Sequence, residues 1–139
     1  MNEIQLTIPG TPIAQKRPRF YRRGNYVGTY SEQETEAGKF IIQAKQSLNG
    51  YFIEQGKPIK LICVFVFPYP KSMSVKKRIN AVHTKRPDLD NCLKFVKDCL
   101  NGIAWHDDSQ VVWVEASKQY GYEPKTEIVL GFNFESEGK

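Results

Sequence analysis

Apolar and polar residues follow two different periods along the chain, and these periods predict which segments are strands and which are helices. Residues 4–8 alternate between apolar and polar side chains, as expected for a half-buried strand. Residues 59–67 are almost continuously apolar and β-branched or aromatic, which is typical of a central strand buried on both faces. Two closing strands are expected near 110–119 and 126–134, with the turn between them at residues 121–124.

Apolar side chains at helical spacing predict two helices between these strands. The first helix follows a capping box of Ser31 and Glu34 and ends at residues 49–50. The second helix covers residues 89–101, and a short basic helix or turn is expected over residues 74–81. The apolar stripe of the second helix consists of Leu89, Cys92, Leu93, Val96, Cys99 and Leu100.

The order of these elements predicts the fold class. The 139 residues contain no repeat, low-complexity tract or linker that would divide the chain. Strands and helices mixed in this order are typical of a single α+β (mixed α/β) domain. We therefore expect residues 1–139 to form one domain, with one mixed sheet and helices packed against it.

Basic residues gather in two stretches that hold no acidic residue, although the net charge is only +5. The first stretch lies within residues 9–30, whose prolines and glycines predict a long basic loop or an irregular hairpin. The second lies between Glu54 and Asp88, and acidic residues gather instead within 88–108 and near the C-terminus. This separation would present a basic rim around an acidic centre to a polyanion such as DNA.

The three cysteines, Cys63, Cys92 and Cys99, are an odd number without a C-x-x-C spacing, and they lie in apolar runs. They argue against a disulfide framework or a zinc site, and for a reducing compartment. The chain begins without a signal-peptide pattern, and no segment reaches the length of apolar sequence needed to cross a membrane. We expect a soluble protein of the cytoplasm.

Asp88 and Asp90 stand at the start of the second helix and have two interpretations. Asp88 follows Pro87 and is a natural N-cap, so the pair could simply cap the helix and favour its dipole. A cap needs only one carboxylate, however, and Asp90 shares the polar face of the helix with Lys94 and Lys97. Carboxylates beside an ammonium group are also what a metal-dependent phosphodiesterase requires.

Asp107 and Asp108 supply the other candidate carboxylates, between the second helix and the following strand. They could belong to an ordinary polar connection, because adjacent aspartates are common there. A connection that returned to the N-terminal end of the helix would bring Asp108 close to Asp88 and Asp90. Three converging carboxylates repel one another unless a cation lies between them, so this arrangement predicts a metal site.

Ordered motifs over most of the chain resemble the RusA family of Holliday junction resolvases, which phages and prophages often encode. The string R-P-D-L-D-N-x-L-K-x-x-x-D begins at Arg86, and W-x-D-D-x-Q-V-V begins at Trp105. Residues 9–12 and 16–19 are similar to the G-x-P and K-x-R-P-R elements of phage-type members, and residues 118–124 match K-x-Y-G-x-x-P.

The resemblance implies roles for individual residues. It assigns Asp88, Asp90 and Asp108 as catalytic, metal-binding aspartates and Lys94 as a catalytic lysine. Asp107 is the alternative to Asp108 as the third ligand. The expected metal is Mg²⁺, with Mn²⁺ as a substitute.

The resemblance also implies an activity and its partners: a homodimer that binds a four-way DNA junction in a bacterial or phage-infected cell. It would resolve the junction by two symmetric nicks, through water activated by the metal rather than through a covalent intermediate. The residues expected to bind DNA are Lys16, Arg17, Arg19, Arg22, Arg23, Lys85, Arg86 and Lys118.

Two alternatives remain open. A different metal nuclease with a restriction-like fold would need a D/E-x-K motif downstream, and neither Asp98 nor Glu115 begins one. A basic DNA-binding regulator without activity would use its aspartates only to cap the helix, so replacing them would leave all of its function intact.

Overall fold

A four-stranded mixed sheet forms the centre of the computed structural model, which describes residues 2–16, 19–23, 26–30 and 34–134. For residues 19–23, 26–30 and 34 it describes the backbone alone. The strands are β1 (Asn2–Pro9), β4 (Ile59–Pro68), β5 (Val111–Gly121) and β6 (Lys125–Phe132). Their order across the sheet is β1-β6-β4-β5, which confirms the expected single domain with one mixed sheet.

The apolar run of β4 explains its position inside the sheet. β4 pairs antiparallel with β6 and parallel with β5, so its backbone hydrogen bonds are satisfied on both sides. Its side chains Leu61, Cys63 and Phe65 are fully buried. These three residues share one face, whereas Ile62 and Val64 on the other face are half-buried, so the expected burial on both faces holds fully only for the face toward the helices. β5, in contrast, lies at the edge of the sheet.

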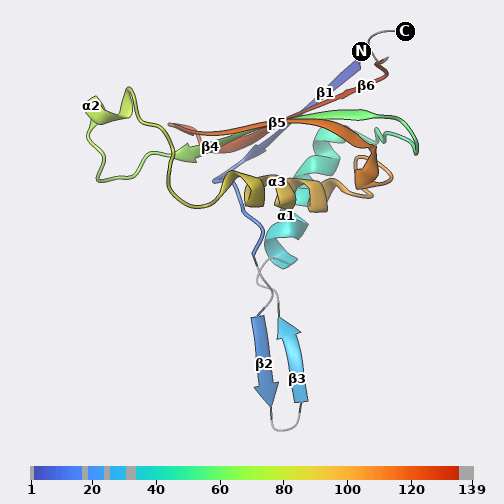
Figure 1. Ribbon diagram of the computed structural model, residues 1–139, viewed down its shortest axis with the longest axis horizontal. Coiled ribbons are helices and arrows are strands. Elements are labelled where there is room, and N and C mark those ends of the chain that lie inside the picture. Colours follow the sequence, from blue (N-terminus) through green and yellow to red (C-terminus); the bar gives the residue numbers. More distant parts are fainter. Residues whose placement is uncertain (1, 17–18, 24–25, 31–33, 135–139) are drawn as a thin grey trace.

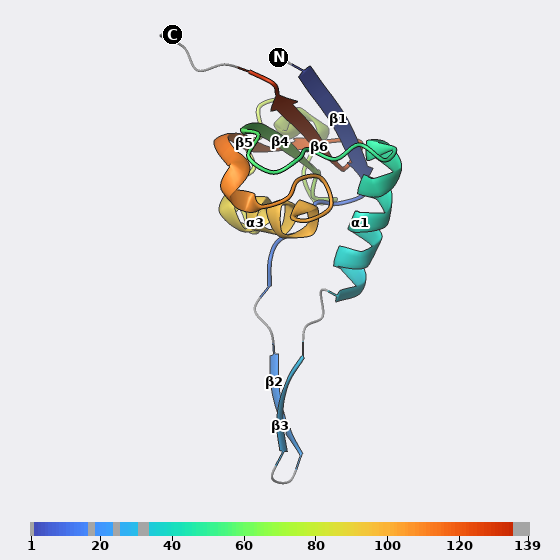
Figure 2. The same cartoon turned by 90° about the vertical axis from the view of Figure 1, so that its right-hand side faces the viewer.

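Two helices cover one face of the sheet, as Figures 1 and 2 show: α1 (Glu34–Leu48) and α3 (Leu89–Leu100). They pack against each other through Phe40 and Phe95, whose rings meet edge to face with centroids 5.5 Å apart. Phe95 is buried although it was not in the predicted stripe, whereas the expected members Leu89 and Leu93 are only partly buried. The core therefore lies between these helices and the sheet.

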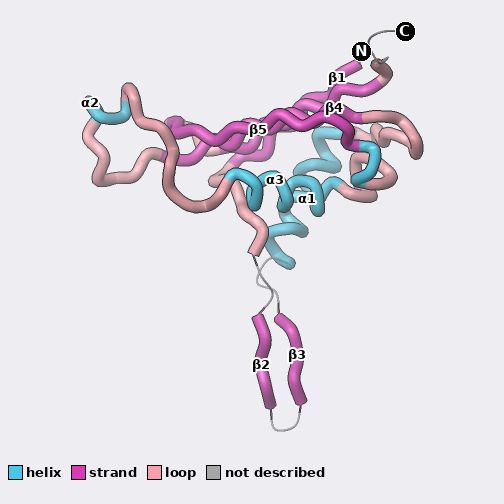
Figure 3. Tube along the Cα trace, in the orientation of Figure 1, coloured by secondary structure: helices cyan, strands magenta, loops and turns pink. Residues whose placement is uncertain are grey.

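Two elements extend away from this core. Strands β2 (Arg19–Arg23) and β3 (Tyr26–Tyr30) pair antiparallel into a hairpin that projects from the body of the molecule (Figure 3). A second extension carries the short helix α2 (Val75–Arg78) at the opposite side of the sheet from the C-terminal end of α3 (Figure 1). The hairpin and the short basic helix confirm the sequence expectations, while Ser31 of the expected capping box lies outside the described residues.

The segment after β1 connects the hairpin to the start of α3. Gly10 has φ of +102°, which favours glycine, and its N–H donates to the carbonyl oxygen of Pro124 at 3.1 Å. The N–H of Gln15 then donates to the carbonyl oxygen of Asn91 in the first turn of α3, at 2.9 Å. These contacts place the base of the basic hairpin beside the N-terminal end of α3.

Among the described helices, none has the length and apolar character that crossing a membrane requires.

Candidate active site

Asp88 occupies the N-cap position of α3 with an extended backbone, as the sequence predicts. Its side chain, however, makes no capping hydrogen bond and is exposed to solvent. An N-cap aspartate that only stabilises a helix accepts a hydrogen bond from a backbone N–H of the first turn. The carboxylate of Asp88 is therefore oriented outward, where a ligand can reach it.

Lys118 holds the loop that precedes Asp88. Its Nζ donates to the carbonyl oxygen of Lys85 at 2.6 Å and to that of Pro87 at 2.9 Å, from the C-terminal part of β5. The peptide bond between Arg86 and Pro87 is cis. An ammonium group has three N–H donors, so two are already engaged in positioning this loop. The contact of Lys118 with DNA stays a prediction and would have to use the third.

Asp90 and Lys94 form an exposed ion pair one turn apart on α3, with Asp90 Oδ2 and Lys94 Nζ 3.4 Å apart. Both side chains are more than three-fifths exposed. An exposed pair at this spacing contributes only a few tenths of a kcal/mol to helix stability, roughly 0.3–0.5. The pair therefore contributes little to the fold, and both charged groups are accessible from solvent.

Asp107 and Asp108 lie in a short connection that ends in the 3-10 helix η1 (Asp108–Gln110). Asp108 Oδ1 accepts a hydrogen bond from the indole N–H of the buried Trp105, at 2.9 Å. Asp107 caps η1, and hydrogen bonds from the Ser109 hydroxyl and N–H lower the pKa of its carboxyl. Each aspartate thus has one local partner, and either carboxylate retains lone pairs for a cation.

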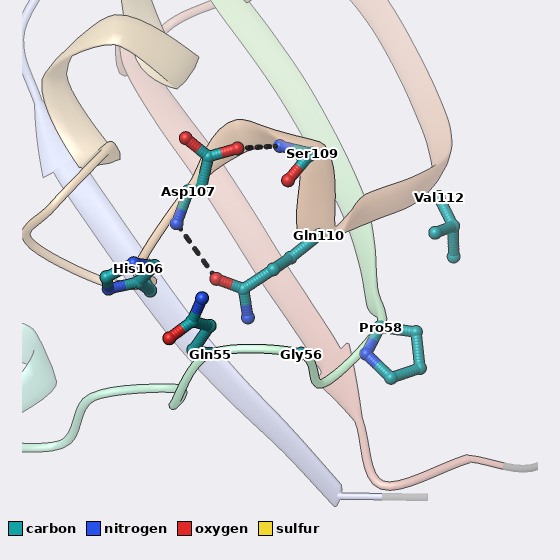
Figure 4. A pocket seen from close by; sticks show the side chains of 8 residues that line it. All are labelled: Gln55, Gly56, Pro58, His106, Asp107, Ser109, Gln110 and Val112. Carbon is teal, nitrogen blue, oxygen red and sulfur yellow. Dashed lines mark hydrogen bonds between the residues drawn. The ribbon is translucent and has the colours of Figure 1, made fainter.

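Gln110 fixes this connection to the body of the protein and was not singled out from the sequence. Its side chain is buried, its Nε2 donates to the carbonyl oxygens of Glu54 and Lys57, and its Oε1 accepts from the N–H of Asp107. Figure 4 shows it at the floor of a hollow of about 430 Å³, which Asp107, His106 and Val112 also line. The hollow contains one carboxylate and excludes Asp88 and Asp90, so it is not the predicted metal site.

The two groups of carboxylates lie at opposite ends of α3. Residues 101–105 form a tight turn directly after the helix, and Trp105 keeps Asp108 beside that turn. Asp88 follows Pro87, whose carbonyl oxygen is bound by Lys118. Lys118 lies seven residues after Val111, the first residue of β5. Seven residues of strand span about 23 Å. Figure 1 shows the same separation, with η1 (orange) beyond the C-terminal end of α3.

The prediction that the connection after α3 returns to the N-terminal end of that helix, and so brings Asp108 close to Asp88 and Asp90, is therefore wrong within a single chain. Among residues 2–16, 19–23, 26–30 and 34–134, no three His, Cys, Asp or Glu side chains form a group that could hold a metal ion. The physical reason is the parallel pairing of β4 with β5, because the chain must travel the whole length of α3 before β5 can begin. The metal-binding and catalytic roles of Asp88, Asp90, Asp108, Asp107 and Lys94 stay predictions.

The predicted DNA-binding residues fall in two places. Lys16 is exposed near the start of α3, where it also pairs with Glu36 at 3.8 Å. Lys85 and Arg86 are exposed in the loop before Asp88. Arg17 and the side chains of the remaining predicted set, Arg19, Arg22 and Arg23, lie outside the described residues. The backbone nonetheless places these three on β2 of the projecting hairpin.

The two histidines differ in environment. His106 is exposed beside the acidic pair, whereas His83 is buried between Phe67 and Tyr120, with ring centroids 4.4 and 4.7 Å away. Burial lowers the pKa of His83, and its buried Nδ1 has no hydrogen-bond partner in the described structure. His83 therefore belongs to the packing of the fold.

Comparison with known proteins gives the family. The family model "Endodeoxyribonuclease RusA" matches residues 9–131. The chain is 34% identical over 137 residues to the uncharacterized protein YqaN of Bacillus subtilis (strain 168), covering 94% of this chain and 96% of that protein. It is also 27% identical over 129 residues to the protein named crossover junction endodeoxyribonuclease rusA of Lactococcus phage r1t, covering 92% and 95%.

The match spans every element that builds the site, from Gly10 and the basic hairpin through α3 and η1 to β6. It therefore includes the exposed aspartates at the start of α3 and the acidic connection at its end. The resemblance inferred from the motifs is confirmed: this chain belongs to the RusA family of endodeoxyribonucleases.

Proposed function

We propose that this chain is a Mg²⁺-dependent endonuclease that resolves four-way DNA junctions as a homodimer by paired, symmetric nicks. The observation that carries the proposal is the exposed group at the start of α3, where Asp88 makes no capping bond and Asp90 lies 3.4 Å from Lys94. The name of the phage relative, crossover junction endodeoxyribonuclease, supports the substrate class.

The donor chemistry fits a hard divalent cation. Asp88 and Asp90 are two exposed carboxylates at the N-cap and in the first turn of α3, and carboxylate oxygens are the ligands that Mg²⁺ prefers. Mn²⁺ takes the same oxygen ligands and would substitute. When bound, Mg²⁺ would polarise the scissile phosphodiester and lower the pKa of water at the site.

The remaining steps use groups of the protein itself. Lys94 places a positive charge beside Asp90, where it offsets the negative charge that develops on the phosphate. Lys118 keeps the Asp88 loop in place through the carbonyl oxygens of Lys85 and Pro87. The basic hairpin begins beside the first turn of α3, so phosphates of the junction can be bound next to the reacting one.

The separation of the two groups of carboxylates supports the proposed homodimer. Asp108 precedes Val111, and about 23 Å of β5 separates Val111 from Lys118, which holds the Asp88 loop, so Asp108 would serve that site if a second copy provided it. A symmetric dimer contains two such sites related by a twofold axis. Two equivalent sites match the two symmetric nicks that resolution of a junction requires.

The test is cleavage of a synthetic four-way junction with and without Mg²⁺, with linear duplex of the same sequence as the control. We expect nicks at symmetric positions that depend on the metal and are much slower on the duplex. Asp90→Asn should bind the junction normally but cleave it about a hundredfold or more slowly, because it loses a charge at the metal. Normal cleavage by Asp90→Asn would overturn the assignment of the site.

Two other outcomes would point to the alternatives. Equal cleavage of junction and duplex would keep the nuclease and remove the junction selectivity. Tight binding without cleavage at any concentration of Mg²⁺ or Mn²⁺ would instead favour the basic DNA-binding regulator.

A further inference from the structure

The α2 extension, residues 69–87 between β4 and α3, leaves large apolar side chains in solvent. Val75, Ile79 and Val82 are 69%, 78% and 74% exposed, and α2 itself buries no residue. Figure 1 shows the extension reaching beyond the end of the sheet, away from the core that the two longer helices cover. Apolar side chains that add nothing to the core and are grouped on one short segment indicate a surface that binds a partner.

An aromatic cluster lies where this extension meets the end of β5. Tyr69 stacks on Tyr120 of β5 and also contacts Tyr122, with ring centroids 5.4 and 5.0 Å away. The guanidinium of Arg78 lies 5.1 Å from the ring centroid of Tyr69 and 5.7 Å from that of Tyr122, and its Nε donates to the carbonyl oxygen of Met73 at 3.1 Å. The ring of Tyr122 is therefore held by its neighbours, yet it is 71% exposed.

The α2 extension is also strongly basic. It has no acidic residue and six cationic ones: Lys71, Lys76, Lys77, Arg78, Lys85 and Arg86. Among the described residues, none of the six forms an ion pair with a carboxylate. The exposed Glu123 beside Tyr122 offsets only one of these charges. Cations mixed with exposed aromatic and apolar side chains fit a nucleic-acid strand that presents both phosphates and base faces.

The extension leads directly into the candidate active site. Lys118 binds the carbonyl oxygens of Lys85 and Pro87, and Tyr120 follows two residues later, about 7 Å along β5. Successive nucleotides of one strand are about 3.4 Å apart along a DNA duplex. A strand that is cut beside Asp88 therefore has bases within a few nucleotides of the tyrosine cluster.

We propose that the α2 extension and Tyr122 bind an unstacked base at the branch point of the DNA, with Tyr122 stacking on the base and the surrounding lysines binding its phosphates. The inference rests on the proposed function for the branched form of the DNA. An aromatic ring stacks on any base, so this surface recognises an open base face rather than a sequence. Ile79 is placed to enter the opened step, as apolar wedges do in other DNA-binding proteins.

This surface explains a preference for branched DNA. In a continuous duplex each base face is covered by the next base pair, so only the phosphates are available to the lysines. At a branch point the stacking is interrupted, and Tyr122 gains a base face to bind. The apolar contacts therefore add affinity for the junction alone, whereas the cationic side chains add affinity for both forms.

Binding in EDTA, where no metal supports cleavage, tests the stacking contact. The probes are a short single-stranded oligothymidylate and an abasic oligonucleotide of the same length, which has the same phosphates without bases. Tyr122→Ala should weaken binding to the oligothymidylate about tenfold or more and leave binding to the abasic strand unchanged. Tyr122→Phe, which keeps the ring, should bind both as wild type does. An equal loss on both probes, or no loss on either, would overturn the stacking role.

Tyr51→Ala is the matched control. Tyr51 is 46% exposed and contacts Phe132, which ends β6 near the start of β4, whereas Tyr69 follows the end of β4. Its ring is thus at the opposite end of the sheet, and its removal should leave both affinities unchanged. A loss of oligothymidylate binding in Tyr51→Ala as large as that in Tyr122→Ala would overturn the assignment to the α2 extension.

The junction itself gives a second readout, again in EDTA. Tyr122→Ala and Ile79→Ser should each weaken binding to a four-way junction about tenfold, with the affinity for linear duplex unchanged. Ile42→Ser, at a side chain that is 60% exposed on α1, should change neither affinity. An equal loss on junction and duplex would overturn the branch-point role. A change in the solution mass of Tyr122→Ala would assign the surface to contacts between copies of the chain and would also overturn it.

The two proposals can fail separately. A protein that cleaves junctions, but whose Tyr122→Ala variant binds oligothymidylate as wild type does, would keep the function and remove this surface. A selective loss of oligothymidylate binding in Tyr122→Ala, in a protein that cleaves no DNA, would keep the surface and remove the function.

Discussion

Lys118 donates a hydrogen bond of 2.9 Å to the carbonyl oxygen of Pro87, the residue immediately before Asp88. Lys118→Met should therefore displace the Asp88 loop and raise the Mg²⁺ concentration needed for half-maximal cleavage, about tenfold or more, as for groups that orient metal ligands. Lys125→Met, which removes the same charge from β6, should leave the requirement unchanged. An altered salt dependence of junction binding with an unchanged Mg²⁺ requirement would instead make Lys118 a phosphate contact.

The basic segment before and within β2 should provide phosphate contacts. Replacing Lys16, Arg17 and Arg19 by Ala should weaken junction binding and reduce the slope of log K against log salt by up to about 3, since each phosphate contact contributes roughly 0.9. The control variant removes three lysines that lie outside residues 9–30: Lys45, Lys57 and Lys125. If the slope of log K against log salt is unchanged in the Lys16, Arg17 and Arg19 variant, residues 16–19 are ordinary surface residues that do not contact phosphate.

Gly121 should be required for packing at the end of β5. A Cβ atom there would lie 2.5 Å from Cγ1 of Val66, so in Gly121→Ala the Val66 side chain or the paired strands must shift. We expect the free energy of unfolding to fall by about 1–3 kcal/mol in chemical denaturation. Gly38→Ala provides the contrast, because its Cβ would meet nothing within 4 Å in α1 and should stabilise the helix by up to about 1 kcal/mol.

His83 should make stability depend on pH. Burial lowers its pKa in the folded state below the ordinary 6.5, so below pH 6.5 the unfolded chain binds more protons than the folded one. The free energy of unfolding should therefore decrease as the pH falls through 6.5 toward 5. His83→Leu should flatten this part of the profile, and a slope unchanged from wild type would contradict the assignment. His106→Asn, at an exposed histidine, is the control.

The periodicity of the sequence predicted nearly every element because burial follows it directly. β4 is apolar at nearly every position since it lies inside the sheet with the helices on one face, and α3 keeps its polar face for Asp90 and Lys94. The prolines and glycines of residues 9–30 predicted the loop or hairpin in the same way. Each of these predictions depends only on residues that are close together in the sequence.

The arrangement of the site depends on contacts between distant residues, which no local pattern contains. The parallel pairing of β4 and β5 sends Asp108 to the far end of α3, and the contact of Lys118 with Pro87 spans 31 residues. Gln110 could have been noticed in the motif W-x-D-D-x-Q, but its two carbonyl partners near residue 55 could not. The exposure of Val112, Trp113 and Val114 is likewise visible only once β5 is known to be an edge strand.

The central claim is that one cleavage site combines Asp90 of one copy with Asp108 of another, and mixed dimers test it most directly. Asp90→Asn and Asp108→Asn, each inactive alone, should regain Mg²⁺-dependent nicking of a four-way junction when they are co-expressed with different tags and purified as the mixed dimer. One of its two sites then contains only wild-type carboxylates, so single nicks should appear at about half the wild-type rate per dimer. A purified mixed dimer that remains as inactive as either parent would contradict the claim.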